Sequence, residues 1–227
     1  MPPPPIERHL QVHRTARYYV VGQPSERTRE IWVACHGYGQ LAEPFAAVFE
    51  PLSDDARVVV APEALSRFYL DEPAKRHGPE SPVGAGWMTR EDRLSEIGDY
   101  VAYLDSVTEV LRAETRPDVR VIALGFSQAV ATVCRWAALG RTRLHRIVLW
   151  GGAIAADLPA DRGAQVFHGA SVVMVAGGRD TVVPVKFMQG ERRTLQKRGL
   201  TVELLEYDGG HALNSEALRR LAEVSGE

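Results

Sequence analysis

Short apolar runs alternate along this chain with segments of helical periodicity. The runs include VVVAP from Val58, VIAL from Val121 and VVMVAGG from Val172, and such continuous runs are typical of strands covered on both faces. Residues 94–111, in contrast, carry apolar side chains three and four positions apart, which indicates a helix with one buried stripe. This alternation predicts right-handed crossovers and a mostly parallel central sheet with helices on both faces, an α/β fold.

The length of 227 residues fits one domain of this class. We expect a single domain over residues 6–227 and a disordered lead at residues 1–5, because the consecutive prolines of MPPPP can join neither a helix nor a strand ladder. The pieces HLQVHR and ARYYVVG predict an antiparallel strand pair at a sheet edge. Residues 63–89 are rich in Pro and Gly but also hold aromatic side chains. We interpret them as a loop-rich insertion that forms a wall or partial lid over a site.

The charges and the cysteines argue against several classes of protein. The formal net charge is −2, and the densest basic group, ERRTLQKR, has the spacing of a solvated helix face, so we expect no nucleic-acid partner. Cys35 and Cys134 lie in apolar stretches and do not indicate a disulfide framework. No signal peptide opens the sequence, and no apolar run reaches the roughly 18 residues of a membrane span. We therefore expect a cytoplasmic protein without stable membrane insertion.

A serine stands where a predicted strand meets a predicted helix. The string GFSQA places Ser127 between the strand at 121–124 and a helix that begins near Val130. A turn this tight strains its central residue and needs small neighbours, here Gly125 and Ala129. The string is a near match to the G-x-S-x-G nucleophile elbow, with Ala in the last position. The alternative is that the serine hydroxyl merely caps the helix.

Two further polar residues follow later strands. Asp180 comes after a buried strand and a Gly-Gly turn, and His211 comes after the last predicted strand, again behind Gly-Gly. A nucleophilic serine needs a base and an acid behind that base, and the chain order Ser, Asp, His is the one that hydrolase elbows use. As alternatives, Asp180 could serve the start of a helix, His211 could be a surface turn residue, and Asp208 could be the acid.

The loop after another strand offers hydrogen-bond donors. A tetrahedral intermediate needs two donors for its oxyanion, and the elbow supplies the backbone N–H of Gln128. The string CHGYGQ is a His-Gly loop that would supply the backbone N–H of Tyr38, with His36 as a brace for the loop rather than a catalytic group. The agreement of four features in type, position and order favours the nucleophile interpretation of Ser127.

These motifs together resemble those of the phospholipase/carboxylesterase family of α/β-hydrolases, which includes acyl-protein thioesterases and small bacterial carboxylesterases. The resemblance spans about residue 31 to the C-terminus and is carried by HGYG, GFSQA, GGRDTVVP and GGH. It implies Ser127 as nucleophile, Asp180 as acid and His211 as base, with Tyr38 and Gln128 as oxyanion donors. The chain departs from the family pattern at Ala129, where the family commonly has Gly, and at Gln40, where it commonly has Asp.

The function implied is that of a serine hydrolase that cleaves a small-molecule ester or thioester through an acyl-enzyme, with no metal or cofactor required. The alternatives are hydrolysis of a lactone or an amide on the same residues, or a hydrolase-like shell that acts as a small-ligand receptor. Four side chains of the 63–89 segment either line an acyl pocket or pin the loop to the core: Phe68, Tyr69, Trp87 and Met88. The sequence specifies no oligomeric state.

Overall fold

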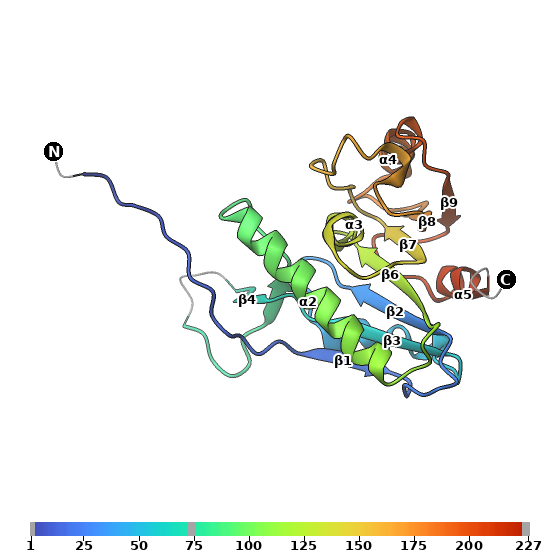
Figure 1. The fold of residues 1–227 in the computed structure, drawn as a ribbon, viewed down its shortest axis with the longest axis horizontal. Coiled ribbons are helices and arrows are strands. Elements are labelled where there is room, and N and C mark those ends of the chain that lie inside the picture. Colours follow the sequence, from blue (N-terminus) through green and yellow to red (C-terminus); the bar gives the residue numbers. More distant parts are fainter. Residues whose placement is uncertain (1–2, 72–75, 224–227) are drawn as a thin grey trace.

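A seven-stranded sheet forms the centre of the molecule (Figure 1). The computed structural model describes residues 3–71 and 76–223. The strand order is β1-β3-β2-β6-β7-β8-β9, and every pairing is parallel except the antiparallel pair of β1 with β3 at one edge. The strands are β1 Tyr18–Val21, β2 Glu30–Cys35, β3 Arg57–Pro62, β6 Arg120–Phe126, β7 Arg146–Trp150, β8 Ser171–Gly177 and β9 Val202–Tyr207.

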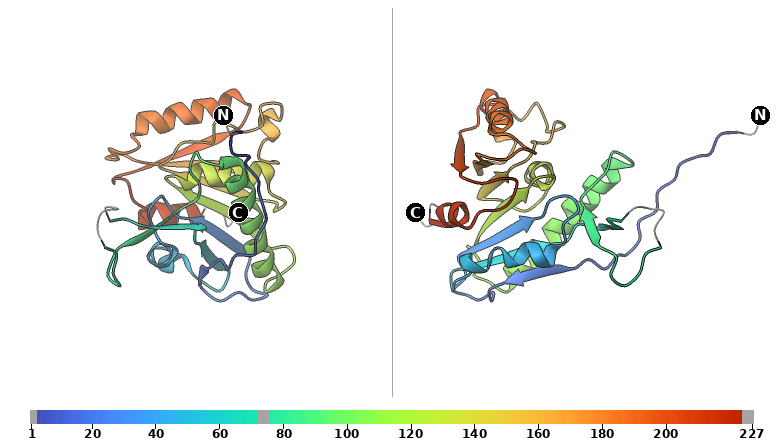
Figure 2. Two further views of the ribbon diagram at one scale, coloured as in Figure 1. Left: turned by 90° about the vertical axis from the view of Figure 1, so that its left-hand side faces the viewer. Right: turned by 180° about the vertical axis from the view of Figure 1, so that it is seen from behind.

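Helices cover both faces of this sheet (Figures 1 and 2). One core cluster joins one face to α2, α3 and α4 through Leu104, Val133 and Met188, and the other joins the opposite face to α1 and α5 through Phe45 and Leu218. The helices are α1 Ala42–Ala47, α2 Arg93–Ala113, α3 Ala129–Leu139, α4 Val185–Lys197 and α5 Ser215–Glu223, with short 3-10 turns at Glu50–Leu52 and Gly163–Gln165. The predicted α/β architecture is therefore confirmed. None of the helices within the described residues is both long and apolar enough to span a membrane.

The predicted strand pair near the N-terminus is wrong. Residues 3–17, which include HLQVHR, form neither strand nor helix, and the start of the described chain extends away from the body of the molecule (Figure 1). Strand β1 pairs with β3 instead. Leu10 and Val12 are 87% and 77% exposed, so their apolar spacing does not correspond to a buried face. Of the expected lead at 1–5, residues 1–2 lie outside the described part of the chain, and disorder of this lead stays a prediction.

The 63–89 segment contains regular structure that the sequence did not predict. Strands β4 Ser66–Tyr69 and β5 Val83–Gly86 form a two-stranded antiparallel sheet. An isolated bridge between Gln40 and Ala85 connects this sheet to the loop after β2. Residues 72–75 of the expected insertion lie outside the described residues.

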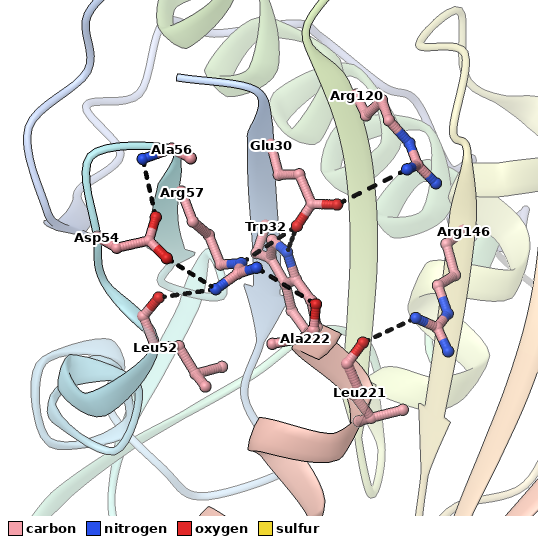
Figure 3. A network of polar contacts seen from close by, with 10 residues as sticks. All are labelled: Glu30, Trp32, Leu52, Asp54, Ala56, Arg57, Arg120, Arg146, Leu221 and Ala222. Atoms are coloured by element: carbon pink, nitrogen blue, oxygen red, sulfur yellow. Dashed lines mark hydrogen bonds and ion pairs between the residues drawn. The ribbon is translucent and has the colours of Figure 1, made fainter. Parts of the chain in front are cut away.

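A polar network at the amino ends of the strands holds the last helix in place (Figure 3). The Arg57 guanidinium donates from Nε to the Glu30 carboxylate over 3.1 Å and from Nη2 to the carbonyl of Ala222 over 3.4 Å. Arg146, which is 4% exposed, donates to the carbonyl of Leu221 over 2.8 Å. Cations at these carbonyls suit the negative end of the α5 dipole. The network therefore anchors the C-terminal end of α5, the helix that follows the loop with His211.

Candidate active site

Three strands deliver polar side chains to the same edge of the sheet. Ser127 directly follows β6, Asp180 follows β8 and His211 follows β9, so all three lie beyond the carboxyl ends of parallel strands. This edge is where ligands bind in sheets of this type.

The turn at Ser127 is strained and tightly enclosed. Its φ angle is +54°, a left-handed value that residues other than Gly rarely adopt. A Cβ at Gly125 would lie 2.3 Å from the carbonyl oxygen of Ala129, and a Cβ at Gly152 would lie 2.2 Å from the carbonyl oxygen of Ser127. Glycine at both positions is therefore what allows the strand to turn into α3 so sharply.

A chain of hydrogen bonds joins the three side chains. The distance from Ser127 Oγ to His211 Nε2 is 3.0 Å, and that from His211 Nδ1 to Asp180 Oδ2 is 2.7 Å. The other oxygen, Oδ1, accepts from the backbone N–H groups of Val182 and Val183 over 2.8 and 2.7 Å. A carboxylate at Nδ1 places the ring proton there and leaves Nε2 free to accept from the serine hydroxyl.

The alternative roles of these residues fit the geometry less well. The N-cap residue of α3 is Gln128, which makes no side-chain capping bond, and the Ser127 hydroxyl faces His211. Asp208 is 84% exposed at its side chain and pairs with Arg179 over 2.9 Å. Asp180 is 2% exposed at its side chain and contacts the imidazole, so it is the better placed of the two carboxylates.

The N–H groups on both sides of Tyr38 in the loop after β2 have acceptors within the protein. The N–H of Gly37 donates to the side-chain oxygen of Gln40 over 2.8 Å, and the N–H of Gly39 donates to the carbonyl of Ala85 over 2.9 Å. The N–H of Gln40 turns back to the carbonyl of Gly37 over 3.3 Å. Within the described residues the backbone N–H of Tyr38 has no acceptor, and its side chain, 60% exposed, stacks on Phe68 with ring centroids 5.1 Å apart.

His36 ties this loop to the end of β3. Its Nδ1–H donates to the carbonyl of Gly37 over 2.7 Å, and its Nε2 accepts from the backbone N–H of Ala64 over 3.1 Å. The ring is fully buried, and this burial lowers the pKa of His36 below its usual value. A neutral ring is what the two bonds require, because only the neutral form can donate at one nitrogen and accept at the other.

The side chain of Gln128 bridges the elbow to the main chain of the 63–89 segment. Its Oε1 accepts from the backbone N–H of Trp87 over 3.1 Å, and its Nε2 donates to the carbonyl of Met88 over 3.1 Å. The backbone N–H of Gln128 itself has no acceptor among the residues that the structure describes. This N–H and that of Tyr38 are therefore both available to a ligand.

An apolar cleft of about 420 Å³ opens beside the imidazole. It starts at His211 and Phe126, whose rings lie 4.9 Å apart, and it runs between α1, β5 and the residues that follow His211. Its walls include Leu41, Phe45, Val48, Val83 and Leu213, and no Asp, Glu, Lys or Arg of residues 3–71 or 76–223 lines it. The cleft therefore fits an uncharged, apolar group next to His211.

The four aromatic or sulfur-bearing side chains expected at a pocket lie elsewhere: Phe68, Tyr69, Trp87 and Met88 are all absent from the lining of this cleft. Trp87 is 3% exposed, and its ring lies 5.4 Å from that of His36. Tyr69 stacks on His77 with centroids 4.0 Å apart. Packing accounts for these positions, and a contact of the four side chains with substrate stays a prediction.

Comparison with known proteins identifies the family. The model of the phospholipase/carboxylesterase family matches residues 16–224. The chain belongs to this family. No curated protein matches it. Among solved structures, esterase PE8 is 21% identical, with 93% of this chain and 98% of the other covered and a TM-score of 0.66.

Two other esterase-type structures are similar to this phospholipase/carboxylesterase family member. Acyl-protein thioesterase 2 of Zea mays is 19% identical, with 93% and 98% of the two chains covered and a TM-score of 0.67. A carboxylesterase of Mesorhizobium loti is 17% identical, with 93% and 95% covered and a TM-score of 0.65. At such identities the likeness concerns the fold, and it supports the α/β-hydrolase architecture expected from the sequence.

One group of described residues in this family member has the spacing of a metal site. Ligand atoms of Glu7, His9 and Asp92 lie within 4.8 Å of one another. All three residues are exposed, and exposed acidic groups commonly lie this close without an ion. The elements that carry Ser127 and His211 contribute nothing to this group.

Several contributors to the site were not found from the sequence of this family member. Gly151 has a φ angle of +56°, and a Cβ there would lie 3.5 Å from the His211 ring. Gly151 and Gly152 directly follow Trp150, the last residue of β7, and two glycines in this position were the sequence signal that could have indicated a close backbone approach there. No local signal pointed to Phe126 as the neighbour of the imidazole, because that contact joins residues far apart in the chain.

Proposed function

We propose that this protein is a serine hydrolase that cleaves a carboxylic ester or thioester through an acyl-enzyme. The observation that carries the proposal is the continuous hydrogen-bond chain from Ser127 through His211 to Asp180, placed on a strained strand-to-helix turn. A hydroxyl is a poor nucleophile at neutral pH, and a neutral imidazole held by a buried carboxylate is the partner that activates it.

The first half of the reaction forms the acyl-enzyme. Ser127 Oγ attacks the carbonyl carbon while its proton moves to His211 Nε2, and the Asp180 carboxylate stabilises the resulting imidazolium. The carbonyl oxygen becomes an oxyanion, for which the N–H groups of Tyr38 and Gln128 are the donors. When the intermediate collapses, the imidazolium returns its proton to the departing alcohol or thiol, and the acyl group stays on Ser127.

The second half repeats these steps with water. His211 takes a proton from a water molecule that attacks the acyl-enzyme, and the same two N–H groups stabilise the second oxyanion. Collapse breaks the bond to Ser127, which recovers its proton from the imidazolium, and releases the carboxylic acid. This chemistry needs no cofactor.

The cleft favours a substrate with an apolar part. Because no charged side chain among the described residues lines it, a carboxylate placed there would lose its hydration without gaining a partner from them. We therefore expect p-nitrophenyl butyrate to be cleaved at least about tenfold faster, in kcat/KM, than p-nitrophenyl monosuccinate, an acyl chain of similar length with a terminal carboxylate. Equal values for the two esters would argue against the cleft as the acyl site.

The test of the function is hydrolysis of short p-nitrophenyl esters by the wild type and by Ser127→Ala. Loss of the nucleophile is expected to lower kcat by a factor on the order of 10⁴ to 10⁶. Ser95→Ala is the matched control, because Ser95 is an exposed serine on α2, and its rate should equal that of the wild type. Equal rates for wild type and Ser127→Ala would end the proposal.

A further inference from the structure

The two proposed oxyanion donors belong to separate parts of the chain. Tyr38 lies in the loop after β2, and Gln128 lies at the start of α3. Two donors stabilise an oxyanion only if the gap between them is held constant through the reaction. Residues 85–88 contact both the loop that carries Tyr38 and the start of α3, so they can fix the distance between the two N–H groups.

The 85–88 segment is bonded first to the loop that carries Tyr38. The carbonyl of Ala85 accepts from the N–H of Gly39 over 2.9 Å, and the N–H of Ala85 donates to the carbonyl of Gln40 over 3.1 Å. The indole Nε1–H of Trp87 donates to the carbonyl of His36 over 2.8 Å, in the buried core. Three hydrogen bonds thus join the segment to residues on both sides of Tyr38.

The same segment is bonded to the elbow through one side chain. The amide of Gln128 accepts from the N–H of Trp87 and donates to the carbonyl of Met88, both over 3.1 Å. The amide therefore pairs with the main chain of two consecutive residues, using its acceptor and its donor together. A carboxylate could not donate to Met88, and an apolar side chain could do neither.

Close backbone packing supports the first junction. A Cβ at Gly84 would lie 2.4 Å from the carbonyl oxygen and 2.7 Å from the Cα of Gly39. These distances leave no room for a side chain, so β5 and the loop after β2 meet backbone to backbone. A side chain at position 84 could be accommodated only if main-chain atoms shifted.

We propose that residues 85–88 form a fixed brace across the oxyanion site, and that the side chain of Gln128 is its positioning residue on the elbow. The inference rests on the proposed function, since it assigns a role in that reaction. Gln128 then acts twice: its backbone N–H is a donor to the oxyanion, and its side chain sets the distance from that donor to Tyr38. The base of the 63–89 segment is accordingly a wall that stays in place during turnover.

The experiment compares kcat and KM for a p-nitrophenyl ester in wild type, Gln128→Met and Trp87→Phe. Each variant removes one attachment of the brace, and a misplaced donor is expected to lower kcat by about 10- to 100-fold while KM changes less than about threefold. Trp136→Phe is the matched control, because it removes a buried indole bond of the same length, 2.8 Å, to Asp105 between α3 and α2. Its kcat, corrected for the folded fraction, should equal that of the wild type.

A second readout does not depend on activity. In the wild type the Trp87 amide should be protected from hydrogen exchange, and Gln128→Met should expose it at least about tenfold faster. Gly84→Ala tests the other junction and should also lower kcat. Wild-type kcat in both Gln128→Met and Trp87→Phe, or unchanged exchange of the Trp87 amide in Gln128→Met, would overturn the brace. Failure of the hydrolase proposal itself is recognised separately, by equal rates for wild type and Ser127→Ala.

Discussion

At the scale of single residues, the two oxygens of Asp180 have different partners. Oδ1 accepts two backbone N–H groups, from Val182 and Val183, so the carboxylate cannot rotate freely. Oδ2 is thereby aimed at Nδ1 of His211. The orientation of the imidazole therefore depends on the backbone at the end of the loop before α4 as much as on the carboxylate itself.

Asp180→Asn should keep the geometry of the contact with His211 Nδ1 but reverse the direction of its hydrogen bond. The two N–H groups of Val182 and Val183 select the amide oxygen for the Oδ1 position, so the amide NH₂ faces His211 Nδ1. The ring must then carry its proton on Nε2 and cannot accept from Ser127, and kcat should fall by a factor of about 10⁴. Ester hydrolysis kinetics check this result.

Asp208→Asn is the control for the residue-scale prediction. Asp208 is exposed and contacts Arg179, so its substitution should leave kcat within about twofold, as is usual for surface ion pairs. A large loss in Asp208→Asn with little loss in Asp180→Asn would show that the acid is Asp208, the alternative that the sequence left open.

At the scale of elements, α5 depends on the network at the amino ends of the strands. Glu30 and Arg57 have side chains that are 8% and 15% exposed, so both charges are largely out of water. Arg57 also donates to the carbonyl of Ala222 at the end of α5 (Figure 3). Loss of this cation would leave a buried carboxylate without its closest charged partner and would remove a contact from α5.

Arg57→Met should therefore lower the free energy of unfolding by about 3 kcal/mol, because breaking a largely buried pair leaves a charge uncompensated. Adding Glu30→Gln to that variant should recover part of the loss, since the remaining charge is removed. Urea unfolding of the two single variants and the double variant measures the coupling. Strictly additive free energies would contradict the pair.

Sequence patterns predicted the elements best where burial is continuous. Strands β6 and β8 are buried at nearly every position, and their apolar runs identified them. The strand predicted at HLQVHR was wrong because apolar spacing alone does not provide a partner strand. Strands β4 and β5 were not predicted because the Pro and Gly residues around them are typical of loops. Ser127, Asp180 and His211 were found because each follows a strand. The cleft was not found, since its walls come from α1, β5 and the loop after His211.

At the scale of the whole molecule, two histidines, His36 and His145, make the free energy of unfolding depend on pH. Burial lowers the pKa of His36 and also lowers that of His145, where nearby arginines add to the effect. In the unfolded chain both rings bind a proton near pH 6.5, whereas in the folded protein they stay neutral to lower pH. Their contribution to stability is therefore complete above about pH 6.5 and is lost as the pH falls below it.

The free energy of unfolding should accordingly be lower at pH 5.5 than at pH 7.5. His145→Asn should reduce the difference, because its side-chain oxygen can still accept from the backbone N–H of Val121, as His145 Nδ1 does over 3.0 Å, while it binds no proton in this range. Urea unfolding at the two pH values checks both statements. Stability that is constant or rises on acidification to pH 5.5 would contradict the assignment.

Covalent labelling of the folded protein with a fluorophosphonate, located by peptide mass spectrometry, tests most directly whether His211 activates Ser127. The expected result is one adduct in the wild type, on the peptide that contains Ser127. Ser127→Ala should show none, and labelling of His211→Gln should be slower by at least about 10³-fold. A folded wild type without an adduct, or labelling of Ser127→Ala at the wild-type rate, would contradict the account.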